Sequence, residues 1–361
     1  MEVLFAVLIS FLITVAATPV VIHFAKRYGL VDNPKLRPHP AHIHKTIIPR
    51  AGGLPVFIGI FVATIFFIPL TKQITGILAS LTILLMVGLA DDKFRDLSPY
   101  ARLTGQLLAA LIVVGSGIGI SFITNPFGGI LQLDPLNLSI NFFNISWTLY
   151  LADLLAVLWI VWVMNMINWS KGVDGQMPSI ALIASLILGY LSFKFFLEGD
   201  ISQLTSAKLA FITAGASAGL LIFNWYPSKI LPAFSGSTIL GFLIAVLAIL
   251  SGAKLATAGL VLLVPATDFI YTFWRRILQG KSPVWGDRGH LHHKLLDLGL
   301  NHQQISLFYI IGSAILGVAA ITLNSKGKLF AAILVGAVVL GTILWLNFFG
   351  GLSKRQGQDS G

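Results

Sequence analysis

The chain has 361 residues, of which 56% are hydrophobic and only 11% charged, and its formal net charge is +10. A water-soluble globular protein carries about a quarter of its residues as charged side chains, so this composition predicts an integral membrane protein. The lack of cysteine excludes disulfides, thiolate nucleophiles and cysteine-ligated metal sites. The basic residues lie beside apolar runs, which favours topology signals and phosphate ligands over nucleic-acid binding.

Eleven apolar runs are candidates for membrane-spanning helices. They lie at about 3–25, 53–70, 74–90, 103–123, 149–167, 178–197, 207–224, 237–252, 255–274, 305–323 and 329–349. We therefore expect an all-α, polytopic integral membrane helix bundle with about eleven transmembrane helices. Residues 1–350 are expected to form a single integral-membrane domain, and residues 351–361 a disordered tail.

The distribution of Lys and Arg predicts the orientation of the chain. The first apolar run has no basic residue before it and ends in Lys26-Arg27, which indicates an N-terminus outside and no cleaved signal peptide. With this orientation, 18 of the 24 Lys and Arg residues fall in inside segments. The clustered histidines and the acidic pair Asp91-Asp92 fall on the same side. One face of the protein is therefore expected to carry a site for an anionic substrate.

Two inside loops combine glycine with charge. His44 and Lys45 precede Pro49-Arg50-Ala51-Gly52-Gly53, where paired glycines allow close backbone approach and basic side chains can meet phosphate oxygens. Helix packing and topology alone explain that loop equally well. In the second of these loops, the motif Gly88-Leu89-Ala90-Asp91-Asp92 places two acids at the end of a spanning run. Two acids at the edge of the hydrocarbon indicate cation binding, proton relay or water exposure, unless they simply begin a solvated loop.

A polar, glycine-punctuated break follows the spanning run at 149–167. Asn165 and Asn168 are one helical turn apart and can present amides to one ligand, and Lys171 and Asp174 follow. Irregular backbone at this depth is tolerated mainly where it lines a cavity, although a simple loop remains an alternative. Asn224 stands at the end of another run, before aromatic residues that could stack on a base or merely lie at the membrane interface.

The last motif is Asp287-Arg288-Gly289-His290-Leu291-His292-His293, in a basic loop between two apolar runs. Four cationic or switchable side chains in seven residues suit a pyrophosphate. The histidines alone could instead hold a transition metal, and a plain solvated turn is the third reading.

Together these loops resemble, in order and over nearly the whole chain, the polyprenyl-phosphate N-acetylhexosamine-1-phosphate transferases. The His-x-His-His form is similar to the N-acetylglucosamine (GlcNAc) 1-phosphate branch of that family. The resemblance implies that a lipid phosphate, such as undecaprenyl phosphate, attacks the β-phosphorus of a UDP-sugar such as UDP-GlcNAc. The products are polyprenyl-diphospho-sugar and UMP. The reaction would initiate the synthesis of a cell-envelope glycan, such as lipopolysaccharide or teichoic acid. It would take place at the cytoplasmic face of the plasma membrane, normally with Mg²⁺.

The resemblance also implies residue roles. Asp91 would deprotonate or orient the lipid phosphate with Asp92 beside it, and Asp92 and Asp174 are the candidate metal ligands. The substrate-binding candidates are His44, Lys45, Arg50, Asn165, Asn168, Asn224, Asp287, Arg288, His290, His292 and His293. UDP-sugar, polyprenyl phosphate and membrane lipids are the expected partners. Nucleic acid is not expected, and the chain is compatible with a homodimer.

The sequence departs from the family pattern at two acidic positions. The usual segment reads Asn-x-x-Asn-x-x-Asp-Gly-x-Asp-Gly, and Lys171 stands at its first Asp; the usual Gly-Asp of the next inside loop aligns with Ala233-Phe234. Two readings stay open: a transferase in which Lys171 joins the catalytic residues and stands in partly for the metal, or a non-catalytic binder or regulator of the same lipid pathway. A transporter is a third class, but it would be expected to show repeats and midplane charges, which are not evident.

Overall fold

A computed structural model of the chain describes residues 1–34, 46–94, 97–133, 135–142, 145–252, 254–282 and 289–358. The described part is an all-α bundle with three small two-stranded antiparallel sheets. Its helices are α1 Glu2–Arg27, α2 Gly53–Phe67, α3 Lys72–Phe94, α4 Pro99–Gly115, α5 Leu151–Trp169, α6 Gln176–Leu197, α7 Gln203–Asn224, α8 Ala233–Leu250, α9 Leu255–Val261, α10 Leu263–Leu278, α11 Leu291–Asp297, α12 His302–Thr322 and α13 Ser325–Gln358. The strands are β1 Val31–Asp32, β2 Ile48–Pro49, β3 Phe122–Thr124, β4 Ile130–Gln132, β5 Asn137–Phe142 and β6 Ile145–Tyr150.

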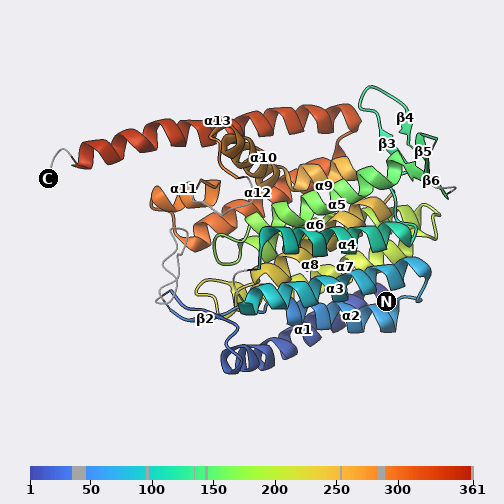
Figure 1. Cartoon of the computed structure of the whole chain (residues 1–361), viewed down its shortest axis with the longest axis horizontal. Coiled ribbons are helices and arrows are strands. Elements are labelled where there is room, and N and C mark those ends of the chain that lie inside the picture. Colours follow the sequence, from blue (N-terminus) through green and yellow to red (C-terminus); the bar gives the residue numbers. More distant parts are fainter. Residues whose placement is uncertain are drawn as a thin grey trace.

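The helices lie side by side, and the chain reverses direction at each end of the bundle (Figure 1). Among the described residues, eight helices are long and apolar enough to cross a membrane, and α9 with α10 make a ninth if the bent pair counts as one span. α2 and α4 are apolar but shorter. These elements account for the eleven apolar runs and confirm the all-α, polytopic class. How many of them cross the membrane, and the outside N-terminus, stay predictions.

α8 is the central helix of the bundle. Every residue from Ala233 to Ile249 is buried, because α8 packs against α2, α3, α5, α6 and α7. A helix that is apolar all round must be enclosed in this way. The first turn of α8 therefore lies in the middle of one end of the bundle, where the loops preceding α2, α6 and α8 meet (Figure 1).

Two predicted spans differ from the structure. The run 103–123 was expected to be one helix, but α4 ends at Gly115 and Gly117 adopts a φ of +99°, which an L-residue rarely tolerates, before strand β3 begins. The run 255–274 is broken between α9 and α10 by an 83° bend. Pro265, in the first turn of α10, has no N–H to continue the hydrogen-bond ladder of α9.

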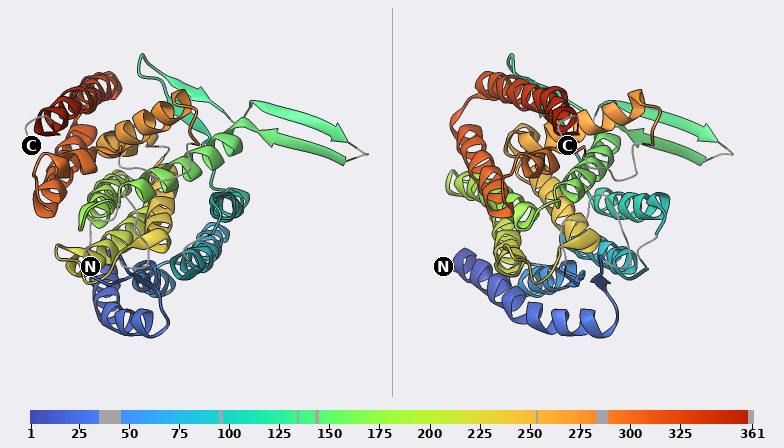
Figure 2. Two further views of the ribbon diagram at one scale, coloured as in Figure 1. Left: turned by 60° about the vertical axis from the view of Figure 1, so that its left-hand side comes forward. Right: turned by 90° about the vertical axis from the view of Figure 1, so that its left-hand side faces the viewer.

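The periphery holds the remaining elements. The β5–β6 hairpin projects from the body of the bundle just before α5 (Figure 2). α13 packs on α9 and α10 at the outside of the bundle and is helical as far as Gln358, within the segment 351–361 for which the sequence predicts disorder. The single-domain division itself is still a prediction.

Candidate active site

Glycines bring three segments into contact at the first turn of α8. A Cβ atom on Gly53 would lie 2.4 Å from the carbonyl carbon of Ser235, and one on Gly88 would lie 2.5 Å from the Cα of Ser235. Only glycine permits this approach, so Gly53 at the start of α2 and Gly88 in α3 serve backbone packing. Gly52 also donates from its amide to the Leu231 carbonyl at 3.1 Å. This packing places Arg50 beside the first turn of α8, where it approaches Asp92.

Asp92, in the last turn of α3, caps the start of α8. It is fully buried, and its carboxylate accepts hydrogen bonds from the Phe234 amide at 2.9 Å, the Ser235 amide at 3.4 Å and the Ser235 hydroxyl at 2.6 Å. A carboxylate is stabilised at a helix N-terminus by the free N–H groups and the helix dipole. Arg50 completes its surroundings, with Nη2 3.8 Å from Oδ1 of Asp92, and Nη1 of Arg50 lies 4.0 Å from Asp32.

Asp91 forms a separate ion pair with Arg102. The Nε of Arg102 lies 2.7 Å from Oδ1 of Asp91, whose side chain is almost fully buried. The guanidinium of Arg102 also lies 5.5 Å from the ring centroid of Phe234. Asp91 therefore fixes the orientation of Arg102, whose side chain is about one-third exposed.

Lys171 lies in the turn between α5 and α6 and enters the same cluster. Its ammonium donates to Oδ1 of Asn168 at 2.6 Å and lies 5.7 Å from the ring centroid of Phe234. The Ser237 hydroxyl donates to the same amide oxygen at 2.8 Å. Burial and the neighbouring Arg50 lower the pKa of Lys171 to about 8, although Asp92 and Asp91 oppose the shift.

Asp174 pins the α5–α6 turn to two other segments. Its carboxylate accepts from the Ser228 amide at 3.1 Å, and its own amide donates to Nδ1 of His302 at 3.4 Å. The Asp174 carboxylate also lies 3.7 Å from the same nitrogen. The Ser306 hydroxyl donates to the Asp174 carbonyl.

Asn224 supports the same turn from the end of α7. Its side-chain oxygen accepts from the Gly175 amide at 3.0 Å and its Nδ2 donates to the Ile230 carbonyl at 2.9 Å. Both ends of this buried amide are thus bonded within the protein. A direct substrate contact by Asn224 remains a prediction that these contacts do not support.

The rings of His290, His292 and His293 form a row beside Lys171. His290 is held by Asp268, with its Nδ1 2.9 Å from Oδ2 of that carboxylate, and its ring lies 5.4 Å from the ring of His292. His292 and His293 are 4.4 Å apart between ring centroids. Burial, with His293 and His290 beside it, lowers the pKa of His292 well below its usual value, so His292 is neutral at pH 7.

Gly172 joins the histidine row to the Lys171 turn. A Cβ atom there would lie 1.8 Å from Nε2 of His292, so only glycine fits between the two segments. The structure thus brings the polar break that follows α5 into direct contact with the histidine motif, as a shared site requires.

An apolar groove of about 590 Å³ opens from this cluster between α4, α5 and α10. Arg102, Asn168 and Phe234 line its polar end. Asn165 lines it as well, with Nδ2 bonded to Gln106 at 2.9 Å and to the Val161 carbonyl. Gln106 lines the groove too, and the remaining lining is apolar or aromatic: Pro99, Leu103, Leu107, Leu158, Val161, Trp162, Trp169, Phe269, Ile270, Phe273 and Trp274.

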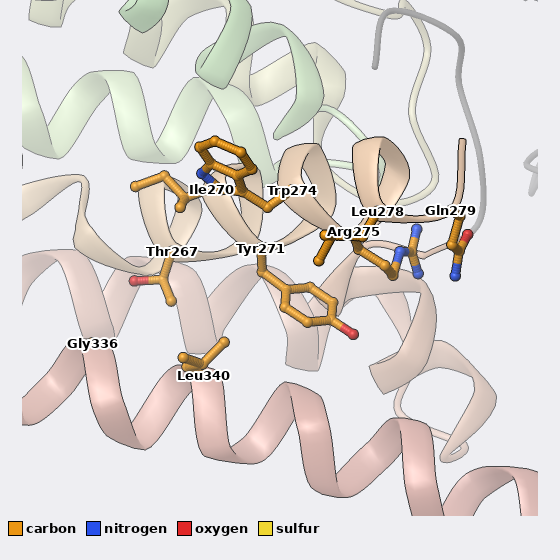
Figure 3. A pocket seen from close by; sticks show the side chains of 9 residues that line it. All are labelled: Thr267, Ile270, Tyr271, Trp274, Arg275, Leu278, Gln279, Gly336 and Leu340. Carbon is orange, nitrogen blue, oxygen red and sulfur yellow. The ribbon is translucent and has the colours of Figure 1, made fainter. Parts of the chain in front are cut away.

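A second groove, of about 640 Å³, lies on the other side of α10, against α13 (Figure 3). Ile270 and Trp274 contribute to both grooves. Figure 3 shows Tyr271 and Leu340 between the two helices and Arg275 toward one end. None of the lining residues of this groove is one of the acids or the lysine of the cluster around Phe234.

The described residues do not fit a divalent-metal site built on Asp92 and Asp174. Asp92 points both oxygens at donors of α8, whereas Asp174 contacts the segment before α8 and the start of α12. Over the described ranges, no group of three or more His, Asp or Glu side chains is placed to hold a metal ion. Magnesium prefers several oxygen ligands in octahedral geometry, and here Lys171 adds a positive charge instead.

The structure therefore assembles one cluster, with the histidine row and Asp174 beside it; its members are Arg50, Asp91, Asp92, Arg102, Asn168, Lys171 and Phe234. His44, Lys45, Asp287 and Arg288 lie outside the described residues. Sequence reasoning missed Asp32, which carries no motif, and the structural roles of Asp268 and His302. An acidic residue near the end of an apolar run, such as Asp268, is the sequence signal that indicates a structural or functional role of this kind.

Comparison with known proteins identifies the relatives. Residues 74–252 match the family model described as glycosyl transferase family 4. The "Probable undecaprenyl-phosphate N-acetylglucosaminyl 1-phosphate transferase" of Bacillus subtilis is 30% identical over 329 residues, covering 89% of this chain and 84% of the relative. The chain belongs to this GlcNAc-1-phosphate transferase family.

Two further family members have similar coverage. The decaprenyl-phosphate N-acetylglucosaminephosphotransferase of Mycobacterium tuberculosis is 29% identical, covering 93% of this chain and 86% of its own length. The undecaprenyl-phosphate alpha-N-acetylglucosaminyl 1-phosphate transferase of Escherichia coli is 26% identical, covering 81% and 76%. These similarities confirm the family that the motifs predicted.

Both departures from the family pattern, Lys171 and Phe234, fall inside the matched region. Ala233 has a φ of +53°, a left-handed conformation that favours glycine. This backbone supports the alignment of Ala233-Phe234 with the Gly-Asp of the family pattern.

Proposed function

We propose that this protein transfers GlcNAc 1-phosphate from UDP-GlcNAc to polyprenyl phosphate and releases UMP. The observation that carries the proposal is the continuity between the apolar groove and the charged cluster: Arg102, Asn168 and Phe234 belong to both. A ligand with a long apolar chain and a phosphate head fits such a groove, since the chain is buried and the head meets cations.

The groove beside α4 and α5, rather than the one beside α13, would hold the lipid. Its polar end lies at Arg102, which Asp91 orients, so Arg102 would bind the lipid phosphate. Of the two roles expected for Asp91, orientation fits this ion pair better than proton removal. A phosphate monoester is already largely ionised at neutral pH, with a second pKa of about 6.

The reaction is a displacement at the β-phosphorus of UDP-GlcNAc. An oxygen of the lipid phosphate attacks that phosphorus, a new P–O bond forms, and the P–O bond to the α-phosphate side breaks, so that UMP leaves. Catalysis of phosphoryl transfer rests mainly on alignment and charge stabilisation. Lys171 and Arg102 would face the phosphoryl group in transfer, and the His290 to His293 row would hold the nucleotide diphosphate.

The site would lie at the cytoplasmic face of the plasma membrane. The distribution of Lys and Arg supports this orientation, because the described parts of the basic segments lie at the end of the bundle that holds the cluster (Figure 1). UDP-sugars are soluble, whereas the lipid acceptor stays in the bilayer, so the reaction needs a site at the boundary.

The test is a product assay with purified protein, UDP-GlcNAc and undecaprenyl phosphate. We expect UMP in the aqueous phase and lipid-diphospho-GlcNAc by mass spectrometry. Asp91→Asn should lower kcat/KM by about a hundredfold, the cost of misplacing a substrate group. Lys194→Met, at the far end of the bundle, is the matched control. Release of UDP would contradict the proposal, and nucleotide-sugar binding without turnover would indicate a binder or regulator instead.

A further inference from the structure

Lys171 and Phe234 stand at the two positions where the family pattern has acids, and the structure makes them neighbours. The Lys171 ammonium lies 5.7 Å from the ring centroid of Phe234, and the Arg102 guanidinium lies 5.5 Å from it. An aromatic ring attracts cations to its face, most strongly where water is excluded. The two residues that depart from the family pattern therefore form one local arrangement, in which the Phe234 ring attracts the Lys171 ammonium.

The ammonium is fixed rather than loosely placed. Asn168 accepts from Lys171 at 2.6 Å, and Ser237, which donates to the same oxygen at 2.8 Å, holds the amide in that orientation. Gly172, next in sequence, packs against His292. The positive charge is thus set between the polar end of the apolar groove and the histidine row, where the proposed lipid phosphate and diphosphate would meet.

Charges in this cluster balance without a metal ion. Among the described residues, the cations Arg50, Arg102 and Lys171 face the acids Asp32, Asp91 and Asp92. Each acid already has a partner, because Asp91 pairs with Arg102 and Asp92 caps α8. A divalent cation would have to displace these partners and would be repelled by Lys171.

We propose that Lys171 is the resident cation of this site, and that the protein binds a nucleotide diphosphate-sugar without a divalent metal ion. This inference rests on the proposed function for the identity of the ligand. The ammonium supplies one positive charge and, because one N–H is bonded to Asn168, two further donors to phosphate oxygens, but it cannot bridge two oxygens at fixed angles. Alignment of the diphosphate then depends on Arg102 and on the row of histidines that Asp268 anchors.

Two measurements on the wild-type protein test this directly. Calorimetric titration with UDP-GlcNAc should give the same affinity in excess EDTA as in Mg²⁺. Electron paramagnetic resonance of added Mn²⁺ should show no stoichiometric bound ion. Loss of UDP-GlcNAc affinity in EDTA, stoichiometric Mn²⁺ binding, or no UDP-GlcNAc binding under either condition would overturn the proposal.

Variants sharpen the test. Lys171→Met should weaken UDP-GlcNAc binding by roughly ten- to a hundredfold, the loss of one hydrogen bond to a charged group, and Lys171→Arg should lose less. The double variant Lys171→Asp, Phe234→Asp should gain Mn²⁺ binding that Phe234→Asp alone lacks. Lys194→Met is the control for removing a lysine. Unchanged affinity in Lys171→Met overturns the proposal even if the double variant fails to fold.

The two proposals fail separately. Metal-free binding of UDP-GlcNAc without any transfer to polyprenyl phosphate would contradict the proposed function and leave the role of Lys171 standing. Transfer that requires Mg²⁺, with binding lost in EDTA, would support the function and contradict the role of Lys171.

Discussion

Ser235 donates a hydrogen bond of 2.6 Å from its hydroxyl to the buried carboxylate of Asp92, and so joins the first turn of α8 to the last turn of α3. The same hydroxyl oxygen accepts from the Gly53 amide at 3.2 Å, so α2 is held as well. Three helices of the bundle therefore depend on one small side chain next to the candidate active site.

Ser235→Ala should destabilise the protein by about 1.5–3 kcal/mol, the value of a hydrogen bond to a charged group, and lower turnover. Ser192→Ala is the matched control. It breaks a neutral hydrogen bond to Ser251 at 2.8 Å, at the other end of the bundle, so it should cost only about 0.5–1.5 kcal/mol and spare turnover. Thermal unfolding in detergent measures both. Equal effects on turnover would show that Ser235 has no special part in the site.

The affinity for UDP-GlcNAc should fall as the pH rises through about 8. Burial and Arg50 lower the pKa of Lys171 to about 8, with Asp92, Asp91 and Arg102 as the other charges that face it. The neutral amine of Lys171 does not attract the diphosphate as its ammonium does, so above pH 8 tight binding takes up a proton, and affinity falls by up to about tenfold per pH unit.

Calorimetry in buffers of different ionisation enthalpy measures this proton uptake. Lys171→Arg should remove it, because a guanidinium stays charged throughout the range. A pH dependence that persists in Lys171→Arg would assign the proton to another group.

Gly172→Ala should impair turnover although it adds one methyl group. Its Cβ would lie 1.8 Å from Nε2 of His292, so either the imidazole or the Lys171 turn must move. A displacement of about 1 Å can cost roughly a hundredfold in rate. Gly341→Ala in α13 is the control, since a Cβ there meets nothing within 4 Å. Full activity in Gly172→Ala would show that the contact is not needed.

Filling the groove beside α4 and α5 should weaken lipid binding selectively. Val161→Trp should raise the KM for polyprenyl phosphate about tenfold, the equivalent of two lost buried CH₂ groups at about 0.8 kcal/mol each, and leave the KM for UDP-GlcNAc unchanged. Leu340→Trp fills the other groove and is the control. If only Leu340→Trp raises the lipid KM, the acceptor uses the groove against α13.

Single cysteines can test the orientation, because the chain has no native cysteine. Lys229, beside the contact between Ser228 and Asp174, and Glu198, at the other end of the bundle, are both exposed. Glu198→Cys should react with an impermeant maleimide in intact cells, and Lys229→Cys only after permeabilisation. The reverse pattern would place the candidate site outside.

The sequence predicted the class of fold and the set of loops because long apolar runs and basic flanks follow directly from the bilayer. It did not predict the bend between α9 and α10, since the apolar run continues through Leu262 and hydropathy takes no account of Pro265. The end of α4 at Gly115 was missed for a similar reason, because the residues that follow in β3 are also apolar.

Within the site, the sequence identified residues but not their partners. It placed Lys171 and Phe234 at altered positions, yet their contact depends on how α5 and α8 pack, which no spacing reveals. The same holds for His302, which contacts Asp174 across 128 positions of sequence. The motif named Asn224 but not its partners, Gly175 and Ile230, to which its side-chain amide is bonded at both ends.

The central claim is transfer of a sugar together with its phosphate, and one double-labelling measurement tests it most directly. Purified protein is given UDP-GlcNAc that carries ³²P at the β-phosphate and ³H in the sugar, with undecaprenyl phosphate as acceptor. Both labels should enter the lipid phase in their starting ratio, with unlabelled UMP in the water phase. Lipid that carries ³H without ³²P, or no labelled lipid at all, would contradict the claim.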